Sequence, residues 1–136
     1  MLVSSFVRPV GGPGTKDILY EVAALAIASV ASGVSNVTGV HSAMGNHALH
    51  VSGLESRFLA QAANAAAGLT RLEADEIVID LVSKYAHRQN EKPIGKPFNE
   101  VYDLATIQPT DEWREIYEAV CEELENIYGL KLPNHS

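Results

Sequence analysis

The sequence contains a single cysteine, Cys121, and few basic residues. One cysteine cannot form an internal disulfide, and Cys121 falls inside a predicted amphipathic helix, where a small apolar side chain packs well. Ten Lys and Arg stand against seventeen Asp and Glu, which gives a formal net charge of -7. Because nucleic-acid-binding proteins use basic surfaces to neutralise phosphates, this composition disfavours DNA and RNA as partners.

Long apolar runs are also lacking. The longest covers residues 22–28 and continues loosely to residue 34. A membrane-spanning helix needs about 20 apolar residues, so we expect a buried helix here and no membrane partner. No basic segment followed by an apolar stretch opens the sequence, which disfavours a secretory signal and makes the cytoplasm the expected location.

The first predicted helix occupies residues 15–32, between Gly14 and Gly33. A glycine directly after the last apolar residue is a typical helix stop. The apolar residues of this segment surround the helix axis instead of forming one stripe, which is typical of a helix buried on all sides.

Three further helices are predicted from their start signals. Ser52 with Glu55, and Thr70 with Glu73, form two capping boxes, in which a hydroxyl and a carboxylate satisfy free backbone amides. The last helix follows Thr110 and ends at Gly129. Apolar residues recur along it at steps of three and four, which predicts one buried face: Trp113, Ile116, Tyr117, Val120, Leu124, Ile127 and Tyr128.

Evidence for strands is limited to two segments. Residues 34–40 are rich in β-branched side chains and predict one short strand. Residues 2–7 are the only other candidate. Because a strand needs hydrogen-bonded neighbours, we expect the partners of this sheet to be missing from the chain.

A glycine-rich segment, Gly11-Gly12-Pro13-Gly14, precedes the first helix and is followed by Lys16. Glycines before a helix allow backbone amides to face an anion, so a small anion-binding domain is one hypothesis. The full nucleotide-binding signatures G-x-x-x-x-G-K-[ST] and G-x-G-x-x-G are absent. We therefore favour a glycine loop that lines the mouth of a barrel.

Three histidines, His41, His47 and His50, lie in one short segment. Imidazole is a common metal ligand, but the spacing H-x5-H-x2-H matches no known metal motif and no carboxylate lies among them. Solvated loop histidines are expected, with no metal site. Since a G-x-S-x-G nucleophile motif is also absent, no self-contained active site emerges.

Short segments along almost the whole chain form one pattern, in a register nearly free of gaps. They are Pro9, Gly12-Pro13 and Thr15; Ala31-Ser32-Gly33; Gly39-Val40 with Ser42-Ala43; Gly53-Leu54-Glu55-Ser56-Arg57; Ala66-Ala67-Gly68; Leu81-Val82-Ser83 with Tyr85; Gly95-Lys96; and Tyr102-Asp103 followed by Pro109-Thr110. This pattern resembles the carboxyl-terminal region of the monomethylamine methyltransferases, which demethylate monomethylamine onto a cognate corrinoid protein.

The resemblance implies an α/β fold, the C-terminal third of a TIM-type (β/α)8 barrel. Residues 1–136 would form a single partial domain, mostly helical, with about four helices and one or two short strands. In that family the reactive pyrrolysine and its neighbouring acidic residues lie upstream of this region. The resemblance therefore implies no catalytic residue here, and no directly bound cofactor, because the corrinoid is carried by the partner protein.

The family contributes polar side chains to its substrate pocket just before the position of Pro9. The matching positions here are Phe6 and Arg8, which differ from the family's usual residues. Either this relative is tuned to another substrate and lacks pyrrolysine, or the start of the chain has diverged. The expected pocket or loop residues are Phe6, Arg8, Gly11, Gly12 and Gly14.

Our leading hypothesis is a C-terminal fragment of a methyltransferase acting on monomethylamine or a related methylated amine, inactive alone. Its partners would be the corrinoid protein and either the remainder of the barrel or further copies of the chain. The alternative is a non-catalytic helical oligomerisation module. In that case the small-residue helix of residues 22–32, or the apolar face that begins at Trp113, would contact another subunit.

Overall fold

The computed structural model describes residues 3–133, and the fold begins with a β–α–β unit. Strand β1 (Ser4–Val7) is followed by helix α1 (Lys16–Ala31) and strand β2 (Asn36–Gly39). The two strands pair in parallel, with Ser4 opposite Asn36 and Val7 opposite Gly39. The expectation that the partner strands of β2 are missing was therefore wrong for one edge of β2, because β1 pairs with that edge. Leu2, the first residue of the other candidate segment, lies outside the described residues.

Helix α1 is the centre of the hydrophobic core. Its cap, Thr15, accepts a hydrogen bond from the amide of Ile18 at 3.4 Å, and Gly33 follows the helix with a φ of 82°. These ends confirm the predicted start and stop. Most of its apolar side chains are buried; Ala28, Val30 and Ala31 in the last turn are half-buried, and Leu25 is 39% exposed. As its apolar sequence indicated, other parts of the chain cover α1 on nearly all sides.

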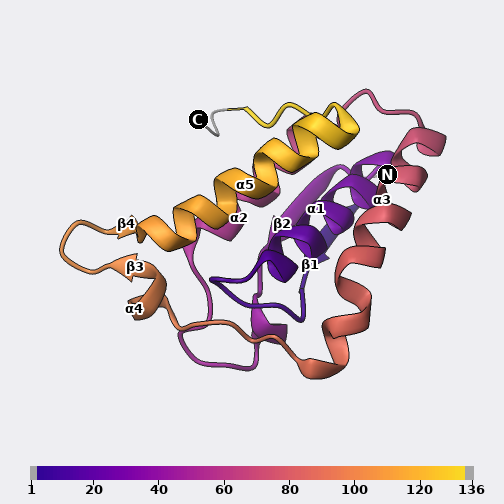
Figure 1. Cartoon of the computed structure of the whole chain (residues 1–136). Helices are drawn as coiled ribbons and strands as arrows, with labels where there is room; N and C mark the ends of the chain where they lie inside the picture. The colour runs from indigo at the N-terminus through magenta and orange to yellow at the C-terminus, as the bar shows by residue number, and fades with distance from the viewer. Residues whose placement is uncertain (1–2, 134–136) are drawn as a thin grey trace.

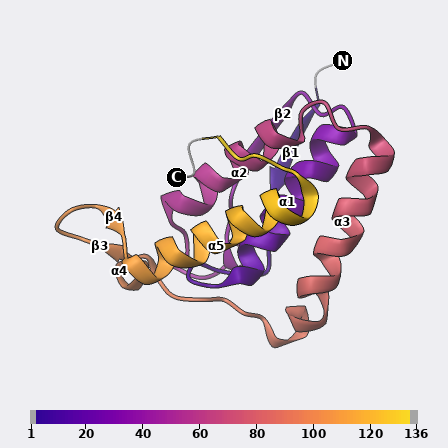
Figure 2. The ribbon, with the colours of Figure 1, turned by 45° about the horizontal axis from the view of Figure 1, so that its top comes forward.

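The other long helices surround α1 (Figure 1). Helix α2 (Gly53–Ala66) lies on one side and helix α3 (Arg71–Tyr85) on the other, and both pack against α1. Helix α5 (Asp111–Tyr128) packs against α2 through Tyr117 and also contacts α1, and the tilted view of Figure 2 shows it in front of α1 and beside α2. One core therefore joins the helices, and the two-stranded sheet lies against it.

The segment between α3 and α5 contains structure that the sequence did not predict. A 3-10 helix (Ala86–Glu91) extends α3, and the short helix α4 (Phe98–Val101) follows. Strands β3 (Tyr102–Asp103) and β4 (Gln108–Pro109) then pair antiparallel as a small hairpin. Residues 104–107 are exposed at its tip, so the hairpin contributes little to the core.

Helix α5 has the predicted bounds but a narrower buried face than its sequence indicated. The Thr110 hydroxyl accepts from the amide of Trp113, and Gly129 ends the helix in the left-handed conformation. Trp113, Tyr117, Val120 and Leu124 of the apolar face are buried, together with Cys121, and Ile116 is half-buried. The prediction was wrong for Ile127, which is 57% exposed, because the last turn borders an open groove between α3 and α5.

The described helices are not of the membrane-spanning type: among residues 3–133, none is both long enough and apolar enough to cross a bilayer.

Candidate functional site

The carboxyl ends of β1 and β2 meet at one edge of the sheet, and two loops leave from this edge. One is the glycine-rich loop after β1, and the other consists of residues 40–52 after β2. The amide of His41 donates to the carbonyl of Val7 at 3.0 Å, which continues the pairing beyond the end of β2. In α/β folds, loops at the carboxyl ends of parallel strands build the functional sites. This edge is therefore the candidate site.

Phe6 projects from the face of the sheet that the helices do not cover. Its neighbour Ser5 forms a hydroxyl hydrogen bond with Ser29 of α1 at 3.0 Å, so Ser5 faces the helices. Because side chains alternate along a strand, Phe6 faces the opposite side, where it is 58% exposed. Its ring lies 4.3 Å from the imidazole of His41, centroid to centroid. The two loops thus place an aromatic pair at the strand ends.

Arg8, the second predicted pocket residue, reaches across to the other loop. Its Nε donates to the carbonyl oxygen of Met44 at 2.9 Å. The guanidinium also lies against Gly45: a Cβ placed on that glycine would lie 3.4 Å from Nε and 3.5 Å from the Cβ of His41. Gly45 has a φ of 70°, a conformation that favours glycine. The structure therefore brings Arg8 and His41 to the two sides of one glycine.

The predicted loop residues Gly11, Gly12 and Gly14 lie beneath this edge. Gly11 and Gly12 are buried and Gly14 is half-buried. A Cβ on Gly12 would lie 1.7 Å from the carbonyl oxygen of Ile94, so only glycine fits against that segment. The glycine loop therefore lies on the buried side of the strand ends. Of the predicted pocket or loop residues, Phe6 and Arg8 are the exposed ones.

The amides of the glycine loop are already paired within the chain. Glu21 of α1 accepts from the amides of Val10 at 2.7 Å and Gly11 at 3.1 Å, and the amide of Gly12 donates to Pro93 at 2.9 Å. Burial raises the pKa of Glu21, and the hydrogen bonds from the loop act in the opposite direction. A carboxylate of the protein itself thus occupies the position that an external anion would need, which argues against the anion-binding hypothesis for this loop.

A cavity of about 320 Å³ opens between β2 and the loop that follows it. It is lined by Val40, His41, Ser42, Gly45, His47, His50 and Val51. The Nδ1 of His50 lies 2.8 Å from the carbonyl oxygen of Ala48, and because a carbonyl only accepts, this nitrogen carries the hydrogen. Among residues 3–133, no three His, Cys, Asp or Glu side chains are arranged to hold a metal ion.

Glu55 lies directly below this cavity and is fully buried. Its carboxyl group accepts from the hydroxyl of Ser42 at 2.8 Å and from the amide of Ser52 at 2.7 Å. Burial raises the pKa of Glu55, although its hydrogen bonds lower it. Because Ser42 lines the cavity, Glu55 fixes the cavity floor to the start of α2.

The sequence did not single out His41 and Gly45 as partners of Phe6 and Arg8. One signal was present: both residues follow the second predicted strand closely, and parallel strands end at the same edge. The parallel pairing of residues 2–7 with residues 34–40 was the missing step. Only the observed register places the two loops beside each other.

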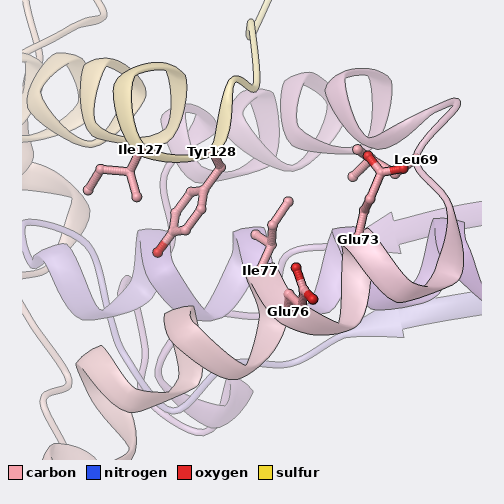
Figure 3. A pocket seen from close by; sticks show the side chains of 6 residues that line it. All are labelled: Leu69, Glu73, Glu76, Ile77, Ile127 and Tyr128. Carbon is pink, nitrogen blue, oxygen red and sulfur yellow. The ribbon is translucent and has the colours of Figure 1, made fainter.

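A second hollow of about 300 Å³ lies on the outer side of the helices (Figure 3). Ile127 and Tyr128 of α5 face Ile77 of α3 across it, with Glu73 and Glu76 at its border. The Tyr128 hydroxyl is bonded to Asp80 instead of pointing into the groove as a free donor. This groove lies away from the strand ends and holds no cluster of reactive groups, so it is not our candidate site.

The two surfaces that the oligomerisation hypothesis uses are mostly buried within the chain. Val22, Ala23 and Ala26 of α1 are fully buried beneath the neighbouring helices, and Trp113 and Tyr117 of α5 are covered in the same core. Leu25 of the first surface and Ile127 of the second are exposed, so contact with another subunit through them stays a prediction.

Comparison with known proteins gives matches across nearly the whole chain. A sequence profile of the family described as monomethylamine methyltransferase MtmB matches residues 1–130. The monomethylamine methyltransferase MtmB2 of Methanosarcina acetivorans is 36% identical over 127 residues, which cover 93% of this chain and 28% of that protein. The MtmB of Methanosarcina mazei is 35% identical over 127 residues, with the same coverage.

Solved structures agree with these matches. The crystal structure of the Methanosarcina barkeri monomethylamine methyltransferase superposes with a TM-score of 0.90 at 35% identity. It is matched over 96% of this chain and 28% of its own, and the crystal structure of a hydroxylamine complex of MtmB matches equally well. This chain thus spans a little over a quarter of the length of these relatives.

Proposed function

Because the chain belongs to the monomethylamine methyltransferase family and matches the C-terminal portion of its members, we propose that it forms the C-terminal part of a methyltransferase. The matched structures are TIM-barrel enzymes. The substrate would be monomethylamine or a related methylated amine, and the methyl acceptor would be a corrinoid on a cognate partner protein. The observation that carries the proposal is the match over 96% of this chain at a TM-score of 0.90.

The contribution of this chain would be to the mouth of the barrel. Active sites of TIM barrels lie at the carboxyl ends of the strands, which is where Phe6, Arg8 and His41 meet. The corrinoid, held by the partner, would supply the metal that accepts the methyl group. The residues of this chain would shape the substrate pocket from one side, and the buried Glu21 and Glu55 would hold its two loops in place.

We propose that the chain is inactive without the remaining strands. The outer edges of β1 and β2 carry no third strand among residues 3–133, so the sheet has two open edges where a barrel has none. The reactive residue that the family resemblance implies, pyrrolysine, would be supplied by that remaining portion. A cytoplasmic location and assembly with further copies stay predictions.

A chimeric enzyme tests this function. The portion of the Methanosarcina barkeri relative that matches this chain would be replaced by residues 1–130, and methylation of the corrinoid protein would be followed by its absorbance. We expect a folded chimera that methylates the corrinoid from a methylated amine, and no activity for the chain alone. The unaltered relative, expressed in the same way, is the positive control.

Two results would count against the proposal. A folded chimera that accepts no methylated amine would contradict the assigned role, and methyl transfer by the isolated chain would contradict its dependence on the rest of the barrel.

A further inference from the structure

The mouth of the candidate site differs in charge from the rest of the molecule. The chain has a net charge of -7, yet the cavity of about 320 Å³ contains no Asp or Glu among its lining residues. Three of those residues are histidines, and Arg8 lies against the lining residue Gly45. Glu55, the carboxyl group closest below, is fully buried and bonded to Ser42 and Ser52. Among residues 3–133, the permanent charge that lies against this cavity lining is therefore the positive charge of Arg8.

Arg8 keeps most of its hydrogen-bonding capacity free for a ligand. Its Nε donates to Met44, and no carboxylate among residues 3–133 forms an ion pair with it. By contrast, Arg88 pairs with two carboxylates and Arg114 with one. A guanidinium has five N–H donors, and its terminal pair matches the two oxygens of a carboxylate. An arginine held by its Nε at an open edge is well prepared for such a bidentate contact.

Phe6 provides the second half of a recognition surface. Phe6 packs against His41, with the ring centroids 4.3 Å apart, and Arg8 lies beside His41 at Gly45. Both side chains therefore lie on the His41 side of the strand end. The face of an aromatic ring attracts ammonium and methylammonium groups. An aromatic face beside a free guanidinium suits a small zwitterion with a methylated ammonium at one end and a carboxylate at the other.

We propose that the surface formed by Phe6, Arg8 and His41, at the border of the cavity, recognises an N-methylated amino acid instead of simple methylammonium. The carboxylate pairs with the Arg8 guanidinium, and the methylated ammonium lies on the ring of Phe6. This inference rests on the proposed methyltransferase function and specifies its substrate class. A methylammonium ion has no carboxylate to pair with Arg8, and its positive charge is repelled by the guanidinium.

Binding to the full 136-residue chain tests the proposal by 1H–15N NMR. N-methylglycine, acetate and methylammonium chloride are the probes, because the first combines the groups that the other two carry separately. We expect N-methylglycine to bind with a Kd on the order of 1 mM and to shift the resonances of Arg8 Nε, His41 and Gly45. Acetate should shift the same signals more weakly, and methylammonium should leave them unchanged.

Two variants and one control locate the interaction. Arg8→Gln should weaken N-methylglycine binding at least tenfold. Arg8→Lys should weaken it less, because lysine keeps the positive charge and loses only the paired N–H donors of the guanidinium. Arg114→Gln, at an exposed residue paired with Asp111, should leave the Kd unchanged. The amide spectrum away from the mouth reports whether each variant is folded. The proposal is overturned if methylammonium binds as tightly as N-methylglycine, if Arg8→Gln leaves the Kd unchanged, or if no carboxylate probe binds.

The chimeric enzyme separates this inference from the function on which it rests. A chimera that demethylates methylammonium in preference to N-methylglycine would overturn the substrate class and leave the methyltransferase role intact. Demethylation of N-methylglycine that depends on Arg8 would support both. A chimera without any methyl transfer would contradict the proposed function, whereas the NMR titration would still report on the pocket itself.

Discussion

The indole Nε1 of Trp113 donates a hydrogen bond to the hydroxyl oxygen of Ser52 at 3.2 Å, across 61 residues of sequence. Ser52 is the cap of α2, so this contact joins the last helix to the start of an earlier one. Glu55 accepts from the same serine and from Ser42 on the cavity floor. The end of the chain is thereby connected to the loop that lines the candidate site.

Ser52→Ala should therefore cost more stability than an ordinary cap substitution. It removes a cap, leaves the buried indole N–H of Trp113 without a partner, and takes one donor from Glu55, so we expect a loss of about 2–3 kcal/mol. Thr70→Ala is the matched control, because Thr70 caps α3 at an exposed position, and about 1 kcal/mol is expected there. Urea denaturation measures both, and equal losses would contradict the coupling role of Ser52.

Gly12→Ala should destabilise the chain strongly. A Cβ at this position would lie 1.7 Å from the carbonyl oxygen of Ile94, a backbone atom that cannot move aside alone. We expect a loss of about 3 kcal/mol or more. Gly33→Ala is the control: nothing lies within 4 Å of its Cβ position, and only the positive φ of 82° opposes alanine, at a cost of about 1 kcal/mol. Thermal denaturation of both variants tests the difference, and a mild effect at Gly12 would argue against this close contact.

Stability should fall as the pH rises above the ordinary carboxyl range. Burial raises the pKa of Asp17, Glu21 and Glu55 above their usual values of about 4, so the folded state binds protons more tightly than the unfolded state. The contribution of these three groups to the free energy of unfolding is thus complete at a pH below their pKa values in the unfolded state. It is lost as the pH rises through their pKa values in the folded state. The free energy of unfolding from urea titrations should decrease over this interval.

Glu21→Gln should flatten that pH dependence, because it removes one of the three groups. Glu112→Gln, at an exposed residue that pairs with Lys96 on the surface, should leave the slope unchanged and is the control. A stability that increases over the same interval would show that the three carboxyl groups are not the groups that dominate the pH dependence.

Cys121 should be unreactive in the folded protein. Its side chain is 1% exposed, and burial raises the pKa of the thiol to about 11. At pH 8 only about one thiol in a thousand would be ionised, and the thiolate is the reactive form. A chromogenic disulfide reagent should react with the native chain only as fast as the chain unfolds, and at once in urea. Rapid reaction of the native chain would contradict the burial of this helix face.

The sequence could predict most helix ends but not the pairing of the strands. Thr70 and Thr110 cap their helices as expected, because a cap depends on a hydroxyl and an amide a few residues apart. Thr15, expected as the first residue of its helix, is the cap of that helix. The parallel pairing of β1 with β2 depends on residues about 32 positions apart, and no local signal encodes it. The hairpin of β3 and β4 was missed for a related reason: strands of two residues have no alternation to detect.

The candidate site was predicted in part. Phe6 and Arg8 were expected to reach a pocket, and they do lie at the exposed strand ends. The glycine loop was expected at the same mouth, but it lies beneath it, because Glu21 and Pro93 hold its amides from within the chain. Buried carboxylates such as Glu21 are indistinguishable by sequence from the solvated ones that surround them on a helix.

The sequence by itself determined the helices, their caps, the buried character of α1 and the resemblance to one enzyme family, because these depend on neighbouring residues and on side-chain periodicity. The tertiary structure decided which residues meet at the candidate site. Arg8 and His41 reach opposite sides of Gly45 only because two parallel strands end at the same edge. The tertiary structure also decided that Ile127 is exposed, although this residue continues the apolar face of α5. The burial of a side chain depends on which other elements cover it and not on its own helix alone.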